Sequence, residues 1–104
     1  MPPAHLHPQQ SEHFTVVQGE MWCLVDGVET TLRAGDTLDV PAGSVHQLRN
    51  PGAEDAVVTW ETRPALRTAE FHRQIAAARR TGDVGAVLAV VSEFADVFVV
   101  AAQP

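Results

Sequence analysis

Four side chains able to bind a metal ion stand in two short segments, with His5, His7 and Glu12 near the start and His46 further along. Side chains of a strand alternate between its faces, so His5 and His7 point the same way. A turn before the next strand can bring Glu12 opposite this pair. Three imidazoles and one carboxylate suit Mn, Fe, Co, Ni, Cu or Zn, whereas calcium and magnesium prefer more oxygen ligands. Four protein ligands leave one or two positions of such an ion open to water or substrate.

The elements that must position these residues are short strands separated by turns, over residues 1–62. Asp26-Gly27 is a two-residue hairpin signal between the apolar run Met21–Val25 and the segment Glu29–Arg33. His46 opens a later strand. Further turn signals stand at Ala34-Gly35-Asp36, Pro41-Ala42-Gly43 and Asn50-Pro51-Gly52. Many short strands with such turns indicate a β-sandwich or barrel.

After Arg63-Pro64 the apolar residues recur at helical spacing. A short amphipathic helix is predicted to end near Thr81-Gly82, and Asp83 is expected to cap a second helix. The apolar positions of the first helix are Leu66, Phe71, Ile75 and Ala78. Those of the second, expected to pack against the barrel, are Val84, Val87, Leu88, Val91, Phe94 and Phe98.

The strand phase also predicts an apolar interior. The residues expected to fill it are Phe14, Val16, Met21, Val25, Leu38, Val40 and Leu48, with Cys23 buried on the same face. Such a lining suits a small organic ligand with an apolar body and one metal-binding oxygen. No arginine is placed inside, although Arg49 or Arg63 could reach the mouth, which argues against a phosphorylated substrate.

The opposite face of the strands is expected to carry different residues. His13 follows Glu12 and so points away from the candidate site, and His72 is expected to be solvated on its helix. Trp22 and Leu24 point outward and need cover from the helices or from a partner chain.

Composition excludes several classes of function. The chain of 104 residues is one domain, has a net charge of −6 and contains no lysine, which disfavours nucleic-acid binding. Cys23 is the only cysteine, and no signal peptide is recognisable, so we expect a cytoplasmic protein. The apolar stretch of residues 84–101 is interrupted by Ser92, Glu93 and Asp96, so no membrane contact is expected.

Two segments resemble the motifs of the cupin superfamily. The first, His-x-His followed by an acidic residue and a glycine, is matched by His5, His7, Glu12 and Gly19 with four and six intervening residues. The second is matched at every fixed position by Gly35, Pro41, Gly43, His46 and Asn50. The chain is therefore identified as a small single-domain cupin of the conserved-barrel type.

The resemblance implies a mainly β fold, with a jelly-roll β-barrel over residues 1–64 and two C-terminal helices, packed on the barrel, within residues 65–104. It also implies one divalent transition metal ion held by His5, His7, Glu12 and His46. The family's opening glycine and the strands before the histidine pair are missing ahead of His5. Either the chain is truncated or a neighbouring subunit completes the barrel, and the open sheet edge predicts a two-fold homodimer.

Three functions fit this resemblance, because the fold hosts many activities. The first is a metal-dependent enzyme of the dioxygenase type, in which the histidines are neutral donors and Glu12 is both a ligand and a catalytic base. The second is a non-enzymatic module that binds a small molecule or a metal. The third is a structural dimerisation domain whose metal holds the barrel together. The sequence has no dedicated acid–base pair beyond the ligands, so it leaves the three open.

Overall fold

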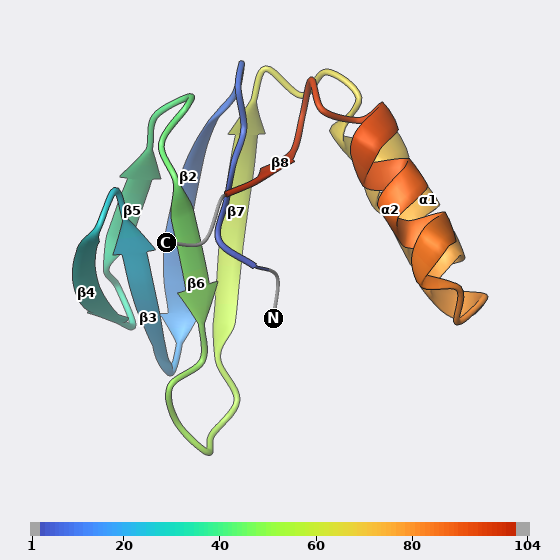
Figure 1. The fold of residues 1–104 in the computed structure, drawn as a ribbon. Helices are drawn as coiled ribbons and strands as arrows, with labels where there is room; N and C mark the ends of the chain where they lie inside the picture. Colours follow the sequence, from blue (N-terminus) through green and yellow to red (C-terminus); the bar gives the residue numbers. More distant parts are fainter. Residues whose placement is uncertain (1–2, 102–104) are drawn as a thin grey trace.

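The computed structural model describes residues 3–101, which form two β-sheets followed by a helical hairpin (Figure 1). The five-stranded sheet has the order β4 (Val28–Arg33), β3 (Glu20–Val25), β6 (His46–Arg49), β1 (His5–Leu6) and β8 (Val99–Val100). The three-stranded sheet has the order β5 (Thr37–Val40), β2 (Ser11–Gln18) and β7 (Val57–Arg63). The helices are α1 (Thr68–Arg80) and α2 (Val84–Glu93). A mainly β jelly-roll fold with two C-terminal helices is thus confirmed.

The two sheets bury a shared core. At its centre lie Val16 from one sheet and Cys23 and Leu32 from the other, all nearly inaccessible to solvent. The residues predicted to fill the barrel divide into the buried Phe14, Val16 and Val40 and the half-buried Met21, Val25, Leu38 and Leu48. Alternation along the strands therefore predicted the inner face correctly.

A tight hairpin fixes the five-stranded sheet next to the candidate site. Asp26 and Gly27 have φ angles of 47° and 83°, and Val25 pairs with Val28 across the turn. Positive φ at both central residues is the requirement of a two-residue hairpin turn of this hand. The Asp26 carboxylate also accepts a hydrogen bond of 3.0 Å from the amide of Val45. The hairpin thereby holds the residue that precedes His46.

Gly19 joins β2 to β3 at a place where the chain passes close to another segment. Its φ is 78°, and a Cβ there would lie 2.8 Å from the carbonyl oxygen of Asp55 and 3.0 Å from the Cα of Ala56. Gly19→Ala should lower the free energy of unfolding by about 2–4 kcal/mol, because the left-handed conformation and the clash act together. Gly35→Ala, where φ is 94° and no atom lies within 4 Å, should cost about 1–2 kcal/mol. Urea unfolding measures both, and equal losses would show that the contact with Asp55 relaxes freely.

The two helices, the helix pair from here on, pack mainly on each other. Their buried residues are Phe71, Ile75, Phe94 and Val97, with Val87, Val90, Val91 and Phe98 packed around them. Asp83 caps α2 as predicted, since its carboxylate accepts a hydrogen bond of 2.8 Å from the amide of Gly85. Neither helix, at 13 and 10 residues, has the apolar length to cross a bilayer within the described chain.

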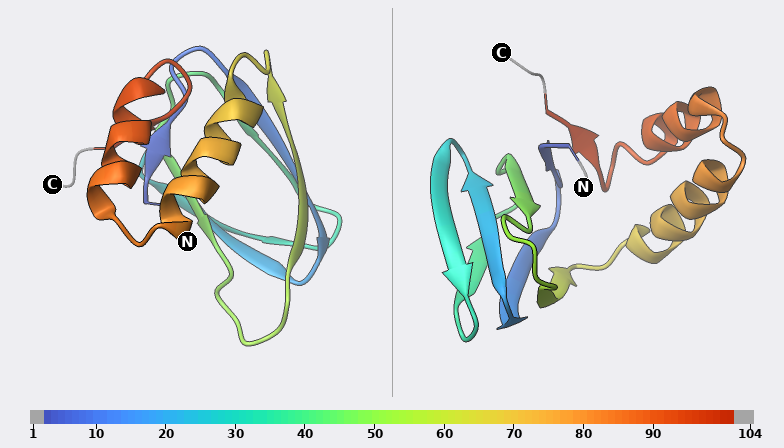
Figure 2. Two further views of the ribbon diagram at one scale, coloured as in Figure 1. Left: turned by 90° about the vertical axis from the view of Figure 1, so that its right-hand side faces the viewer. Right: turned by 90° about the horizontal axis from the view of Figure 1, so that it is seen from below.

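The prediction that Val84 and Leu88 pack against the barrel is wrong. Their side chains are 71% and 63% exposed. The helix pair connects β7 to β8, which are edge strands of the two sheets, and it stands beside the barrel rather than along its outer wall (Figure 2). Because α2 is apolar on several sides but meets α1 on only one, no layer of the described structure covers these two residues.

Trp22 has a contact on the outer face that sequence reasoning did not predict. Part of its cover comes from the neighbouring strand, because the guanidinium of Arg49 on β6 lies 4.3 Å from the centre of its ring. The two residues are paired across β3 and β6 on the outer face. A cation over an aromatic face both shields and stabilises the ring. Leu24, on the same face, is half-buried.

Candidate metal centre

The structure brings His5, His7, Glu12 and His46 together inside the barrel. One ligand atom from each lies within 4.8 Å of those of the others. His5 on β1 and His46 on β6 are direct cross-strand partners in the five-stranded sheet. His7 follows β1, and Glu12 reaches over from β2 in the other sheet. The site is therefore built where the two sheets face each other.

Each of the three imidazoles is oriented by a hydrogen bond from its Nδ1 atom to a backbone carbonyl. The acceptors are Pro3 for His5 at 2.7 Å, Val97 for His7 at 2.6 Å, and Ser44 for His46 at 3.1 Å. A carbonyl oxygen can only accept, so each Nδ1 carries the hydrogen. In the neutral ring the Nε2 atom then presents its lone pair, the arrangement in which metal-binding histidines are held.

The centre of this cluster needs a cation. The Oε1 atom of Glu12 lies 2.5 Å from Nε2 of His7 and 3.1 Å from Nε2 of His46. With the hydrogens on Nδ1, a carboxylate oxygen faces two nitrogen lone pairs, which repel it unless a proton or metal ion lies between them. Nε2 of His7 and Oε1 of Glu12 are buried and have no hydrogen bond of acceptable geometry. This donor set therefore fits a divalent transition ion.

The protonation of the cluster follows from its burial and contacts. Burial lowers the pKa of His5 to about 4, although its bond to Pro3 opposes the shift. Burial alone would raise the pKa of Glu12, but its short contacts with the imidazoles of His46 and His7 favour the ionised carboxylate, outweigh burial and lower the pKa to about 2. For His7 burial is likewise outweighed, here by Glu12 and Val97, and its pKa is raised. Near neutral pH, Glu12 is ionised and His5 is neutral. Below its raised pKa, His7 holds the proton that competes with a metal ion.

Metal affinity should consequently depend on pH through His7. Because its pKa is raised above 6.5, binding must displace a proton at lower pH, and apparent affinity should fall by about tenfold per pH unit below that pKa. Affinity should level off above it, and the proton of His5 should compete only near pH 4. Calorimetry in buffers of different ionisation enthalpy counts the released protons. Affinity that does not change between pH 4.5 and 6.5 would contradict this assignment, whereas His13→Ala should leave the profile unchanged.

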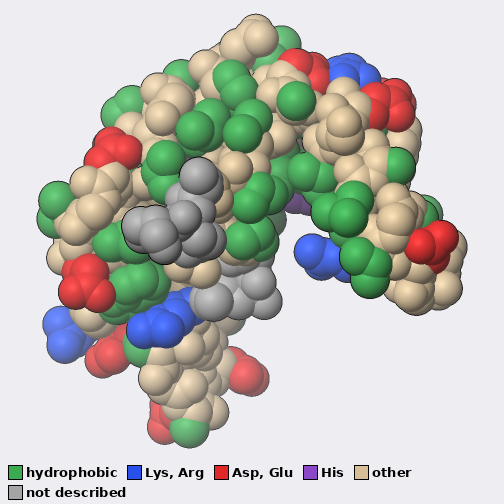
Figure 3. Space-filling model, in the orientation of Figure 1, with side chains coloured by type: hydrophobic (Ala, Val, Ile, Leu, Met, Phe, Trp, Pro, Cys, Tyr) green, Lys and Arg blue, Asp and Glu red, His purple; other side chains and the backbone are tan. Residues whose placement is uncertain are grey.

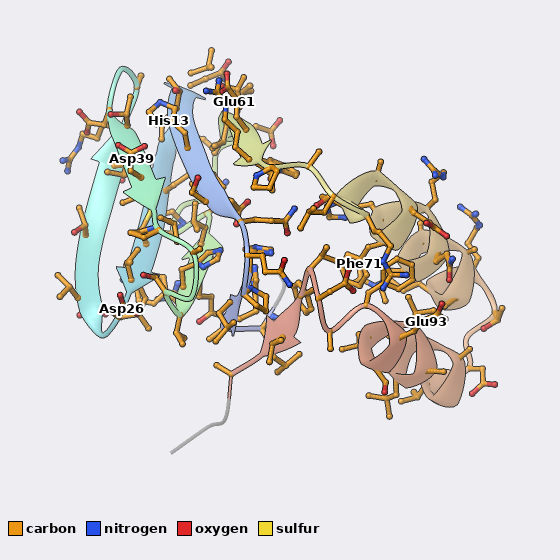
Figure 4. The ribbon with its side chains drawn as sticks, turned by 90° about the horizontal axis from the view of Figure 1, so that it is seen from above. His13, Asp26, Asp39, Glu61, Phe71 and Glu93 are labelled. Atoms are coloured by element: carbon orange, nitrogen blue, oxygen red, sulfur yellow. The ribbon has the colours of Figure 1, made fainter. Side chains whose placement is uncertain are left out.

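His13 lies on the outer face of the three-stranded sheet, as the strand phase predicted. Its Nδ1 is 2.6 Å from the carboxylate of Asp39 on the adjacent strand. Figure 4 shows His13, Asp39 and Glu61 side by side on that face, away from the helix pair. Arg63 pairs there with Glu61 at 2.5 Å and does not line the barrel pocket. The expectation that Arg49 or Arg63 reaches the pocket mouth is therefore wrong.

A pocket of about 330 Å³ opens from the cluster toward the helix pair. Figure 3 shows a hollow between the barrel and the helices, with hydrophobic side chains on both walls and histidine at its back. Beyond the four candidate ligands, the lining residues are Phe14, Met21, Leu48, Val58, Trp60, Thr62, Thr68, Phe71, His72, Val97 and Phe98. Sequence reasoning missed those from Val58 onward as pocket residues. Alternation along β7 was the available signal for Val58, Trp60 and Thr62, whereas nothing local pointed to the helical ones.

Comparison with known proteins agrees with the fold. The family model described as the cupin domain matches residues 1–61. The oxidoreductase iacF of Pestalotiopsis fici is 41% identical over 61 residues, covering 56% of this chain and 30% of the relative. Quercetin 2,3-dioxygenase of Bacillus subtilis is 42% identical over 45 residues, covering 43% of this chain and 13% of the relative. The chain thus spans less than a third of either curated relative.

A solved structure gives the same picture. An uncharacterised conserved protein with a double-stranded β-helix domain from Klebsiella pneumoniae superposes with a TM-score of 0.57 at 31% identity. The match covers 62% of this chain and 53% of that one. The residues matched by the family model, 1–61, contain all four candidate ligands.

Proposed function

Because the chain belongs to the cupin family, we propose that His5, His7, Glu12 and His46 hold one divalent transition metal ion, and that the pocket above it binds a small organic molecule. The observation that carries this proposal is the set of three Nδ1–carbonyl hydrogen bonds, which leaves three Nε2 atoms turned toward one ionised carboxylate. When bound, such an ion polarises an oxygen ligand and supports redox chemistry if it is iron or manganese.

We further propose that the reaction is an oxidation of the dioxygenase type. The two curated relatives are named an oxidoreductase and a dioxygenase, which supports this class for the shared barrel. The residues of this chain would exclude water, since the pocket is mainly apolar, and orient the ligand above the cluster. Glu12, the one carboxylate among the lining residues of the described chain, is the group that would accept a proton from a hydroxyl of the ligand.

The test combines metal content with oxygen uptake. Protein purified without an affinity tag is analysed for bound elements and then screened for oxygen consumption with catechols and diketones. Iron or manganese at one ion per chain, with uptake that His46→Ala abolishes, is the expected result. Failure of any divalent transition ion to bind would reject the metal site itself.

A non-enzymatic binding module is the second candidate. It is favoured by the pocket lining, where His72 is the one titratable side chain in addition to the four candidate ligands among the described residues. His72 is exposed at the helix surface, and no acidic side chain is seen to orient its imidazole among the described residues. Tight binding of metal and of a catechol without oxygen uptake or any other turnover would favour this function.

We also propose a homodimer. The edge strands β7 and β8 each pair on one side only within the described chain, which leaves backbone groups free to pair with a second copy. Val57 on β7 and Val100 on β8, each 44% exposed, add apolar area at these edges. Sedimentation velocity at micromolar concentration should give a species near twice the chain mass of 11.2 kDa. A single species at the chain mass would reject the dimer.

A further inference from the structure

We propose that the pocket selects a planar aromatic ligand that is uncharged apart from its metal-binding oxygens, and that Trp60, Phe71 and Phe98 form the subsite for its ring. This inference rests on the proposed metal site, which would hold the oxygen end of the ligand. It assigns a role in recognition to residues 68–98, which lie outside the part of the chain that the family model matches.

One wall of this aromatic subsite is the inner face of β7. Trp60 is paired with Phe14 on β2, and the next inward residue, Thr62, is paired with Glu12. The indole therefore lies one step along the strand from the candidate metal ligand. Trp60 is 55% exposed, and a large aromatic side chain left open at a pocket mouth gains stability when a ring covers it.

The opposite wall comes from the helix pair. Phe98 stacks on His5 at 4.5 Å between ring centres and on Phe71 at 5.0 Å, with interplanar angles of 27° and 26°. The three rings are stacked one on the next in a column that begins at a candidate metal ligand and runs outward. Because both neighbours stack on Phe98, the column presents ring edges to the pocket that it lines. Figure 4 places Phe71 at the end of the helix pair nearest the barrel. A flat ligand bound at the cluster can lie against the exposed indole of Trp60 and meet these ring edges in edge-to-face contact, whereas a puckered aliphatic ring would lose much of that contact.

The charges around the pocket exclude a second anionic group on the ligand. All seven cationic side chains of the protein are arginines, and none of them is among the residues that line the pocket. Arginines with partners elsewhere include Arg33 with Glu20, Arg49 with Trp22, Arg63 with Glu61 and Arg67 with Asp96. The arginine that Figure 3 shows on the helix side of the hollow lies outside this lining. A carboxylate or phosphate away from the metal would thus be desolvated without a guanidinium partner, since the polar groups there are the hydroxyls of Thr62 and Thr68 and the imidazole of His72.

The test compares an aromatic and an aliphatic chelator in cobalt(II)-loaded protein, whose visible spectrum reports coordination without turnover. The probes are 4-methylcatechol and acetohydroxamate. Trp60→Ala should weaken the binding of 4-methylcatechol by about tenfold and change the affinity for acetohydroxamate by less than twofold. Because each chelator is compared between wild type and variant, differences in their intrinsic affinity for the metal cancel. The matched control is Trp22→Ala, which removes the only other tryptophan, a residue outside the pocket, and should change neither affinity.

Two further measurements make the result decisive. In a Trp22→Phe background, 4-methylcatechol should quench the fluorescence of Trp60, and 4-sulfocatechol should bind at least tenfold more weakly than 4-methylcatechol. Phe71→Leu, which retains an apolar side chain in the helix core, should also weaken the binding of 4-methylcatechol more than that of acetohydroxamate. If cobalt binds but both chelators respond alike to Trp60→Ala, or if the sulfonated ligand binds as tightly, the aromatic subsite is wrong and the metal site stands. If cobalt itself does not bind, the metal site fails first and the subsite with it.

Discussion

Replacing His46 with alanine should weaken metal binding by more than 100-fold. His46 is 2% exposed, and its Nε2 atom lies 3.1 Å from the Glu12 carboxylate. Its loss removes one of four donors, and changes to groups that merely orient a ligand already cost about 10–100-fold in affinity. The remaining donors, His5, His7 and Glu12, would leave a coordination position to water.

The matched control is His13→Ala, since His13 is the next histidine along the chain from the cluster and points to the outer face with Asp39. It should change affinity by less than twofold. Cobalt(II) titration followed by visible absorption measures both variants, and circular dichroism checks that each keeps its strands. Similar losses for the two variants would mean that the cluster is not the binding site.

The convergence of the four candidate ligands was predictable because it depends on local rules. Side-chain alternation placed His5 and His7 on one side, and turn signals on either side of β5 placed His46 at the start of a strand. Glu12 opens β2, as its position after the turn suggested. Short strands with well-defined turns leave little freedom of register, so residue phase translates directly into direction.

The atoms that orient these ligands were not predictable in the same way. His7 is held by the carbonyl of Val97, 90 positions away in the sequence. Every residue type has a backbone carbonyl, so the identity of residue 97 gives no signal of this contact. The contact depends on how the helix pair returns the chain to β8. The apolar stripe of α2 indicated that this helix is buried, but it did not indicate which element the helix packs against. In the structure that element is α1 and not the barrel wall.

These two points connect the helices to the chemistry of the site. The carbonyl of Val97 fixes the ring of His7, and the adjacent Phe98 stacks on His5. Packing within the helix pair therefore sets the direction of two candidate ligands. A change that loosens the helices should be felt at the metal even though it touches none of the four.

Phe94→Ala should be the most destabilising of the substitutions considered, at about 3–5 kcal/mol in the free energy of unfolding. Phe94 is fully buried, its ring centre lies 5.6 Å from that of Phe71, and the guanidinium of Arg67 lies 4.1 Å above it. Arg67 in turn pairs with Asp96, so alanine would leave a cavity and remove the support of an ion pair.

Leu88→Ala is the control within the same helix pair. At 63% exposed, Leu88 should contribute less than about 0.5 kcal/mol, because surface substitutions rarely exceed that value. Urea unfolding followed at 222 nm reports the helices, and cobalt affinity reports the site. Phe94→Ala should lower the unfolding midpoint and weaken cobalt binding together, since Val97 and Phe98 directly follow the disturbed segment, whereas Leu88→Ala should do neither. Loss of helix signal with unchanged cobalt affinity would show that the barrel alone orients His5 and His7.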